Sequence, residues 1–225
     1  MTEWILKKVD YQYKKSAVKT LDGINGSFQT AKSYQVFGDS GSGKSTFLAL
    51  LAGLIVCTEG ALTVAGAELA ELDRNTYRGH TVACLFQEGS LLEDSAMANL
   101  EMEMLLSGSS VDKVEIAKVL LSVGLTEKQL NISVTKLSKK DRQLVSLAKL
   151  LVKKRAELIL VDEPEQVFSD CGVAKAMRLL KKHCLQNDTC LIFTTQTTQS
   201  VSFADELWGL NRGKLLFIKE QHSVM

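Results

Sequence analysis

The sequence lacks the features of a membrane-spanning chain or of one that binds polyanions by bulk charge. Its 225 residues include one proline, and 27 lysines and arginines face 26 aspartates and glutamates, for a net charge of +1. A balance so close to neutral excludes binding to nucleic acid through bulk positive charge, and we expect no nucleic-acid partner. The longest uncharged, apolar-rich run, residues 45–58, is shorter than the about 20 residues that a membrane helix needs.

The cysteines do not form the framework of a disulfide-rich protein. They form no C-x-x-C pair and are odd in number: Cys57, Cys84, Cys171, Cys184 and Cys190. We therefore interpret them as small buried apolar residues in a reducing cytosol. The N-terminus has no basic region ahead of an apolar core, so we expect no signal peptide. A composition of 45% hydrophobic and 24% charged residues is typical of a globular protein, and the length favours one soluble, intracellular domain.

Hydrophobic patterning predicts an α/β fold with a helical insertion between about residues 88 and 153. The expected strands are 4–13, 21–28, 34–37, 61–64, 81–86, 158–161 and 190–193, with a closing pair near Leu207 and Leu215. The expected helices are 44–54, 97–124, 140–152 and 173–185. The apolar stripe of the second is assigned to Val111, Val114, Ala117 and Leu121, and that of the third to Leu144, Leu147, Ala148 and Leu151.

The strongest chemical signal is the run from 38 to 46, which satisfies G-x-x-x-x-G-K-[ST] between a strand and a helix. Its glycines let successive backbone N–H groups point at phosphate oxygens, Lys44 would reach the β and γ phosphates, and the Ser45 hydroxyl would ligate Mg²⁺. The alternative is a glycine-rich turn that merely caps a helix. The candidate nucleotide-binding residues are Gly38, Asp39, Ser40, Gly41, Ser42, Gly43, Lys44, Ser45 and Thr46.

The second signal is an apolar strand, 158–161, that ends in the carboxylates of Asp162 and Glu163. Parallel sheets bind ligands at the carboxyl ends of their strands. Asp162 would hold Mg²⁺ directly or through water, and Glu163 would polarise the water that attacks the γ-phosphate. A solvated strand end is the alternative, which the phosphate-binding loop upstream disfavours.

Together these motifs resemble the nucleotide-binding subunit of an ABC transporter over essentially the whole chain. The resemblance implies a RecA-like P-loop NTPase core with an N-terminal antiparallel β-subdomain and an inserted α-helical subdomain. Residues 1–225 would then form one domain, with 1–87 and 154–225 as core and β-subdomain and 88–153 as helical subdomain. Tyr13 matches the aromatic residue that stacks on adenine, although Tyr11 lies two residues away on the same expected strand face. Gln87 matches the glutamine that senses Mg²⁺ and the membrane subunit.

The stretch from Leu69 to Leu106 is similar to the lipoprotein-release, macrolide-export and bacteriocin-export group, which pairs the ATPase with a separate permease. The resemblance implies ATP and Mg²⁺ as cofactors. It also implies a second ATP-binding subunit, identical or different, and an integral-membrane permease that holds the chain at the cytoplasmic face of the membrane. An export or extrusion system is expected.

Three family elements are altered. The signature Leu-Ser-Gly-Gly-Gln is here Leu137-Ser138-Lys139-Lys140-Asp141, whose Ser138 would meet the γ-phosphate held by the opposite subunit. Ser169 stands where an aspartate is usual, and Gln196 replaces the switch histidine. A glutamine can still donate a hydrogen bond to a γ-phosphate, but it cannot carry a proton or a positive charge. We therefore expect tight MgATP binding and slow hydrolysis by a homodimer, with faster turnover if a partner subunit supplies a normal signature. The alternative is a non-catalytic or weakly hydrolysing, ATP-gated regulatory subunit. A soluble ATPase acting on nucleic acid is disfavoured, since paired domains and coiled-coil insertions are missing.

The near-neutral charge is a cancellation between two stretches. Residues 136–155 contain eight lysines and arginines and one aspartate, whereas 88–103 contain five acidic residues and no basic one. The stretches are either solvated helix faces, or the acidic one docks basic segments of the permease while the basic one faces nucleotide or lipid headgroups. On the docking interpretation, Glu101 and Glu103 would contribute to the permease contact.

Overall fold

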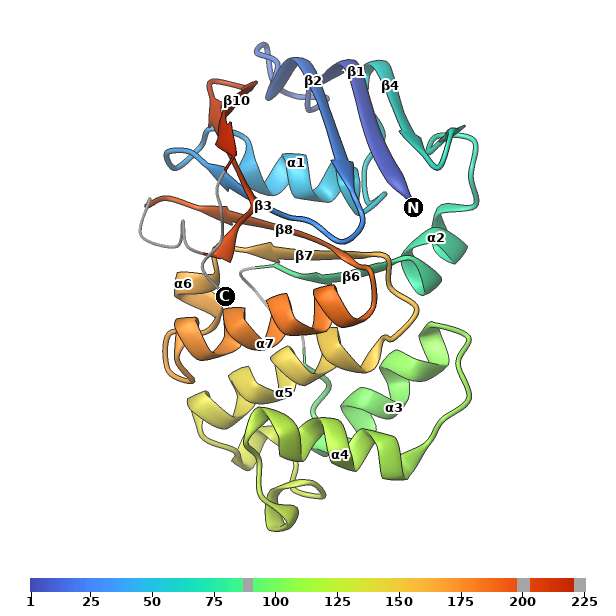
Figure 1. Ribbon diagram of the computed structural model, residues 1–225, viewed down its shortest axis with the longest axis vertical. Helices are drawn as coiled ribbons and strands as arrows, with labels where there is room; N and C mark the ends of the chain where they lie inside the picture. The colour runs from blue at the N-terminus through green and yellow to red at the C-terminus, as the bar shows by residue number, and fades with distance from the viewer. Residues whose placement is uncertain (87–90, 198–202, 221–225) are drawn as a thin grey trace.

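The computed structural model describes residues 1–86, 91–197 and 203–220, stacked in layers along one long axis (Figure 1). The elements are β1 (Glu3–Tyr11), β2 (Leu21–Gln29), β3 (Ser33–Phe37), α1 (Lys44–Leu51), β4 (Glu59–Val64), β5 (Ala67–Glu68), α2 (Arg74–His80), β6 (Val82–Leu85), α3 (Ala96–Leu106), α4 (Lys113–Val123), α5 (Lys139–Val152), β7 (Leu158–Asp162), α6 (Pro164–Val167), α7 (Val173–Gln186), β8 (Cys190–Thr195), β9 (Glu206–Asn211) and β10 (Lys214–Glu220). Two short 3-10 turns, η1 (Glu127–Gln129) and η2 (Val134–Lys136), lie between α4 and α5.

The strands form two sheets. One is antiparallel, with the order β2-β1-β4-β5. The other has the order β10-β9-β3-β8-β7-β6, and its strands from β9 to β6 are parallel while β10 is antiparallel. The non-consecutive order places β3 between β8 and β9, so the ends of strands far apart in sequence meet at one edge. The expected α/β class and the antiparallel N-terminal strands are confirmed.

The six-stranded sheet separates two apolar layers (Figure 1). Helix α1 lies between the two sheets, and α5 and α7 cover the opposite face of the larger one. Side chains of β7 alternate between the layers: Leu158 and Leu160 pack with α1, whereas Ile159 and Val161 pack with the helices on the other side. Strands buried on both faces explain why β7 and β8 are continuously apolar in sequence.

Helices α3, α4 and α5 pack against one another at the end of the molecule farthest from the antiparallel sheet (Figure 1). The single helix expected over 97–124 is wrong, because α3 ends at Leu106 and α4 begins at Lys113. Gly108 has a positive φ of 63°, and the Asp112 side chain accepts hydrogen bonds from the first N–H groups of α4 as its N-cap. The assignment of residues 88–153 to a separate subdomain stays a prediction.

The apolar stripe expected for α4 is wrong at two of its four positions, whereas Val111 and Ala117 are half-buried against the core. Val114 and Leu121 are 64% and 39% exposed, whereas Ile116, Leu120 and Val123 are buried. This stretch carries apolar residues at two helical phases, and packing against α3 and α5 selects one of them. The stripe expected for α5, from Leu144 to Leu151, is buried as predicted.

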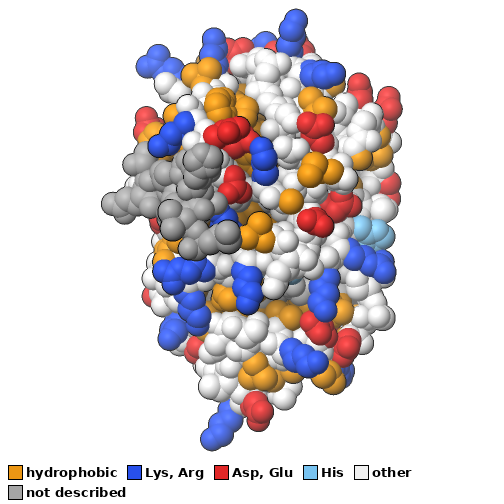
Figure 2. Space-filling model, in the orientation of Figure 1, with side chains coloured by type: hydrophobic (Ala, Val, Ile, Leu, Met, Phe, Trp, Pro, Cys, Tyr) orange, Lys and Arg blue, Asp and Glu red, His pale blue; other side chains and the backbone are white. Residues whose placement is uncertain are grey.

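Opposite charges meet within the chain. On the face drawn in Figure 2, lysine and arginine side chains are interspersed with acidic ones over the lower half of the molecule. The acidic stretch therefore neutralises part of the basic stretch directly. The ion pairs that join the helices are Glu101–Lys113 (3.7 Å), Glu103–Lys149 (3.6 Å), Glu103–Lys153 (3.6 Å) and Glu115–Lys154 (2.9 Å).

The expectation for the cysteines holds for three of the five. Cys171, Cys184 and Cys190 are buried, and burial raises the pKa of the Cys184 thiol to about 12. Cys57 is half-buried and Cys84 is exposed, so burial is wrong for these two. Cys84 lies on β6, which is an edge strand of the larger sheet in the described part of the chain.

Candidate functional site

The loop between β3 and α1 ends in a helix start that no side chain caps. The N-cap residue of α1 is Gly43, with φ 105° and ψ 10°, and it supplies no side-chain hydrogen bond. A Cβ at Gly43 would lie 2.8 Å from the carbonyl oxygen of Thr20, so both conformation and space require glycine here. The first N–H groups of a helix have no intrahelical partner, and here they are left available to an anion.

The Lys44 side chain is 5% exposed and turns back over the loop. Its Nζ donates to the carbonyl oxygens of Gly38 at 2.8 Å and Asp39 at 3.0 Å, and lies 3.5 Å from Glu163 Oε1. Two neutral carbonyl oxygens, which a charged ligand can displace, therefore hold the ammonium at the mouth of the loop.

Two neighbouring strand ends supply the carboxylates. Asp162, the last residue of β7, accepts hydrogen bonds from the Ser45 hydroxyl at 2.7 Å and from the Thr194 hydroxyl of β8. The Asp162 side chain is buried, so its two oxygens are fixed between α1 and β8. A hydroxyl and a carboxylate in contact are hard oxygen donors of the kind that Mg²⁺ prefers, so Ser45 and Asp162 fit this ion.

Glu163 lies at the junction of β7 and α6 in a left-handed conformation, φ 52° and ψ 68°, that non-glycine residues rarely adopt. Its N–H donates to Thr194 Oγ1 at 3.2 Å. Its carboxylate accepts from Gln196 Nε2 at 2.7 Å on Oε1 and from Gln166 Nε2 on Oε2. Strain of this kind collects at functional sites, where it fixes the direction of a reactive side chain.

These groups surround one pocket of about 330 Å³. Its lining brings together the start of α1, Glu163 and Gln196, which lie far apart in the sequence. The buried Oγ of Ser42 has no hydrogen-bond partner in the described part of the chain. This hydroxyl lies beneath the loop, where a Cβ at Gly38 would be 2.6 Å from it, and Ser42 is not part of the pocket lining. The residues that line the pocket are Thr20, Ser40, Gly41, Gly43, Lys44, Ser45, Thr46, Glu163, Gln166 and Gln196.

Tyr13 lies beyond the end of β1, which stops at Tyr11, so the strand expected to reach Tyr13 is two residues too long. The Tyr13 ring is 48% exposed, and its hydroxyl lies 3.0 Å from Thr46 Oγ1 in α1. Tyr11 contacts it edge-on, with ring centroids 4.9 Å apart, and packs against the core instead. Of the two tyrosines, Tyr13 is thus the one that an adenine beside α1 could reach.

Of the two remaining candidate residues, Ser138 lies apart from this pocket. Gln87 falls outside the residues that the structure describes. Ser138 is the N-cap of α5: its hydroxyl donates to Asp141 Oδ2 at 2.7 Å and accepts from the Asp141 N–H at 3.1 Å. Next to it, Lys139 forms an ion pair of 2.9 Å with Asp170.

Sequence reasoning missed Thr194 and Gln166. Thr194 contacts both neighbouring carboxylate residues, but a threonine at the end of a buried strand gives no distinctive signal. The sequence did contain a signal for Gln166: this residue follows Glu163 by three positions, so the two side chains share a helix face.

The sequence that builds this site matches a known protein family. The ABC transporter family model matches residues 21–166, which is well over half of the chain. The chain belongs to the ABC transporter family. Its ATP-binding domains act as ATPases, so this chain is an ABC-type ATPase and the ATP-binding subunit of a transporter.

Curated relatives cover nearly the full length. The chain is 31% identical over 222 residues to an uncharacterized ABC transporter ATP-binding protein, YclH of Bacillus subtilis (strain 168), covering 97% of each sequence. It is 31% identical over 211 residues to the lipoprotein-releasing system ATP-binding protein LolD of Wigglesworthia glossinidia brevipalpis, covering 91% of each.

Solved structures share the fold. The dimeric, post-hydrolysis ATP-binding cassette MJ0796 bound to ADP and Pi superposes with a TM-score of 0.86 at 23% identity, covering 99% of both chains. The cbiO1 subunit of Clostridium perfringens gives 0.80 at 18%, covering 95% of this chain and 86% of that one. Within the described ranges, no helix is both long and apolar enough to span a bilayer.

Proposed function

We propose that the chain binds MgATP, dimerises and hydrolyses ATP to drive a separate membrane permease, as an export or extrusion system. The observation that carries the proposal is the convergence of Lys44, Ser45 and Glu163 on one polar pocket at the strand ends, with Asp162 hydrogen-bonded to Ser45 next to it. The names of LolD and YclH, both ATP-binding proteins of transporters or release systems, support it.

In the proposed reaction, the N–H groups at the start of α1 and the Lys44 ammonium bind the phosphates. Lys44 exchanges its two carbonyl acceptors for phosphate oxygens, which are stronger acceptors because they are charged. Glu163, directed by its backbone conformation, accepts a hydrogen bond from the attacking water and then its proton. Tyr13 covers the adenine.

Ser45 and Asp162 would hold Mg²⁺. The ion would neutralise charge on the phosphates during the transfer. Before the ion binds, the Ser45 hydroxyl donates a hydrogen bond to the Asp162 carboxylate, so the two oxygen ligands already lie next to each other.

We infer that a homodimer turns over slowly. The site lacks the switch histidine, and Gln196, which takes its place, is engaged with Glu163. In the partner subunit's site, the segment around Ser138 would bring Lys139 and Lys140 to the nucleotide instead of glycines. Lys139 is already paired with Asp170, and this contact opposes a backbone approach to phosphate. These features also favour the second candidate, a weakly hydrolysing regulatory subunit of such a complex.

Steady-state hydrolysis separates the two candidates. We would tag this chain, purify it from detergent-solubilised membranes with the subunits that it retains, and measure kcat and ATP affinity for wild type and Glu163→Gln. The enzyme predicts turnover that Glu163→Gln lowers to a residual rate while ATP binding persists. Binding without turnover in both proteins would identify the regulatory subunit, and absence of ATP binding would refute both.

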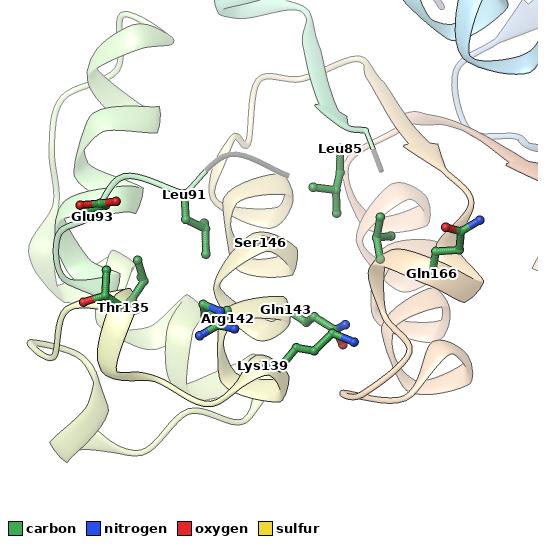
Figure 3. A pocket seen from close by; sticks show the side chains of 11 residues that line it. Leu85, Leu91, Glu93, Thr135, Lys139, Arg142, Gln143, Ser146 and Gln166 are labelled. Atoms are coloured by element: carbon green, nitrogen blue, oxygen red, sulfur yellow. The ribbon is translucent and has the colours of Figure 1, made fainter. Parts of the chain in front are cut away.

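The permease would dock in a groove of about 540 Å³ beside α5 (Figure 3). Leu91 and Glu93 stand on one wall, Gln166 on the opposite wall, and Arg142 and Ser146 project from α5 between them. Glu101 and Glu103, expected to take part in docking, already pair with lysines of the same chain. Glu93 is thus the acidic side chain that lines the groove.

Charge reversal at the groove tests the docking. Glu93→Lys should weaken co-purification of the membrane subunit, because a basic segment would then face like charge. Glu71→Lys, an exposed reversal outside the groove, is the matched control. Equal recovery of the membrane subunit with both variants would refute this docking site.

A further inference from the structure

We propose that Gln166 is a positioning residue for Glu163, holding its carboxylate in the orientation that hydrolysis requires. The inference rests on the proposed ATPase function.

The contact follows from local geometry. Glu163 is the N-cap of α6 and Gln166 is the third residue of this helix, so the two side chains lie on the same face one turn apart. The backbone N–H of Gln166 donates to the carbonyl oxygen of Glu163 at 2.8 Å, and this bond fixes the turn. Gln166 Nε2 then reaches Glu163 Oε2.

The two oxygens of Glu163 have separate donors. Oε1 accepts from Gln196 at 2.7 Å and faces Lys44 at 3.5 Å, whereas Oε2 accepts from Gln166. Gln196 comes from the segment after β8 and Gln166 from α6, so the carboxylate is fixed from both sides. A neutral amide fixes a carboxylate without the full charge neutralisation that a second lysine would bring, and it leaves a lone pair on Oε2 for water.

Gln166 also lines both cavities, the nucleotide pocket and the groove beside α5. In Figure 3 its amide points away from the groove, while its stem forms part of the groove wall. The contact with Glu163 therefore lies at the boundary between the two cavities. A segment that binds in the groove would therefore contact Gln166, the side chain that positions Glu163.

A purely local role makes a different prediction. If Gln166 only stabilised the four-residue helix α6, its removal would lower the melting temperature and leave the reaction unchanged. A positioning role instead lowers kcat while the KM for ATP stays nearly constant, because Glu163 acts on the attacking water rather than on ATP binding.

The experiment compares Gln166→Ala and Gln166→Glu with wild type in the complex purified through a tag on this chain. Gln166→Ala should lower kcat by about 10- to 100-fold, the expected loss of a hydrogen bond to a charged group that orients a reacting side chain. Gln166→Glu keeps the shape but replaces the donor with a second carboxylate, and should lower kcat further. KM should change by less than about twofold, since the phosphate-binding groups are untouched. Gln186→Ala, at the exposed end of α7, is the matched control and should behave as wild type.

A double variant separates this inference from the proposed function. In a Glu163→Gln background, Gln166→Ala should cause no further loss, because its target is already gone. An active wild type with unchanged kcat in Gln166→Ala would overturn the positioning role alone. Equal losses from Gln166→Ala in both backgrounds would also overturn it. A wild type as inactive as Glu163→Gln would overturn the proposed hydrolysis, and the positioning role with it.

Discussion

Lys153 joins three elements through one buried ammonium, and removing it provides a sharp test of the packing. The residue follows the end of α5, and its side chain is 5% exposed. Its Nζ donates to the carbonyl oxygens of Arg78 at 2.8 Å and Val82 at 2.7 Å, and lies 3.6 Å from Glu103 of α3. The variant Lys153→Met keeps the apolar stem and removes the charge.

The cost of Lys153→Met comes from the acceptors that remain. Two buried carbonyl oxygens would lose their donor, at about 1–3 kcal/mol each. Part of this loss is offset because methionine avoids the desolvation of an ammonium and preserves contacts along the stem. We expect a net destabilisation of about 2–4 kcal/mol, which lowers the melting temperature by about 5–15 °C in a domain of this size.

The effect should also depend on pH. Burial lowers the pKa of Lys153 from its ordinary 10.5, and Glu103 opposes this shift only partly. Between the lowered value and 10.5 the unfolded chain binds more protons than the folded one, so this residue's contribution to stability rises with pH. The difference between wild type and Lys153→Met should therefore grow as the pH rises from the lowered pKa towards 10.5.

Urea denaturation followed by circular dichroism measures both effects. The matched control is Lys154→Met, whose side chain is 59% exposed and pairs with Glu115 at 2.9 Å. Surface pairs contribute about 0–1 kcal/mol, so this variant should remain close to wild type. Equal midpoints for Lys153→Met and Lys154→Met, at equal slopes, would refute the assigned bridging role.

Three further outcomes are expected. Tyr13→Ala should weaken ATP binding by about 5- to 100-fold in equilibrium titrations, whereas Tyr13→Phe retains the ring; unchanged affinity in the alanine variant would exclude stacking. Gly43→Ala should cost about 2 kcal/mol of stability and abolish ATP binding, because φ is 105° and a carbonyl oxygen lies 2.8 Å from the new Cβ. Gly41→Ala meets nothing within 4 Å and should be milder; equal losses would contradict the steric argument. The pKa of Asp10 is lowered, chiefly by its hydrogen bond from Lys19, so its stabilisation exists above its ordinary 3.8 and is lost as pH falls through the lowered value. Asp10→Asn should therefore flatten the acid unfolding curve, and an unchanged curve would contradict this assignment.

The elements with strong local signals could be predicted from the sequence. The apolar run of β7 ended in carboxylates, and the glycine-rich loop marked the start of α1, so both strand and helix were placed within a few residues. Helix α5 has apolar residues at one helical phase only, and its buried face followed from spacing alone. Helix α4 has apolar residues at two helical phases. Which of the two faces is buried depends on neighbouring helices that the sequence does not identify.

Interactions between distant segments could not be predicted. The ion pairs of Glu103 with Lys149 and Lys153 depend on how α3 packs against α5. Residue types alone left only a solvated helix face and docking as equal alternatives. The break before α4 was visible as Gly108-Ser109-Ser110 ahead of a capping Asp112, but helical periodicity outweighed it. Within the site, Gln196 was identified as a possible phosphate donor, yet its contact with Glu163 required the chain to fold.

The position of β3 between β8 and β9 has a consequence for synthesis on the ribosome. The backbone at Gly38 approaches the carbonyl oxygen of Leu210 so closely that a Cβ would lie 2.3 Å from it, and its N–H donates to Thr195 at 3.1 Å. At about 5–20 residues per second, the strands that flank this loop emerge up to about half a minute after it. The phosphate-binding loop is thus among the first parts of the chain to be made, but it cannot form its contacts with β8 and β9 until nearly the whole chain has been synthesised.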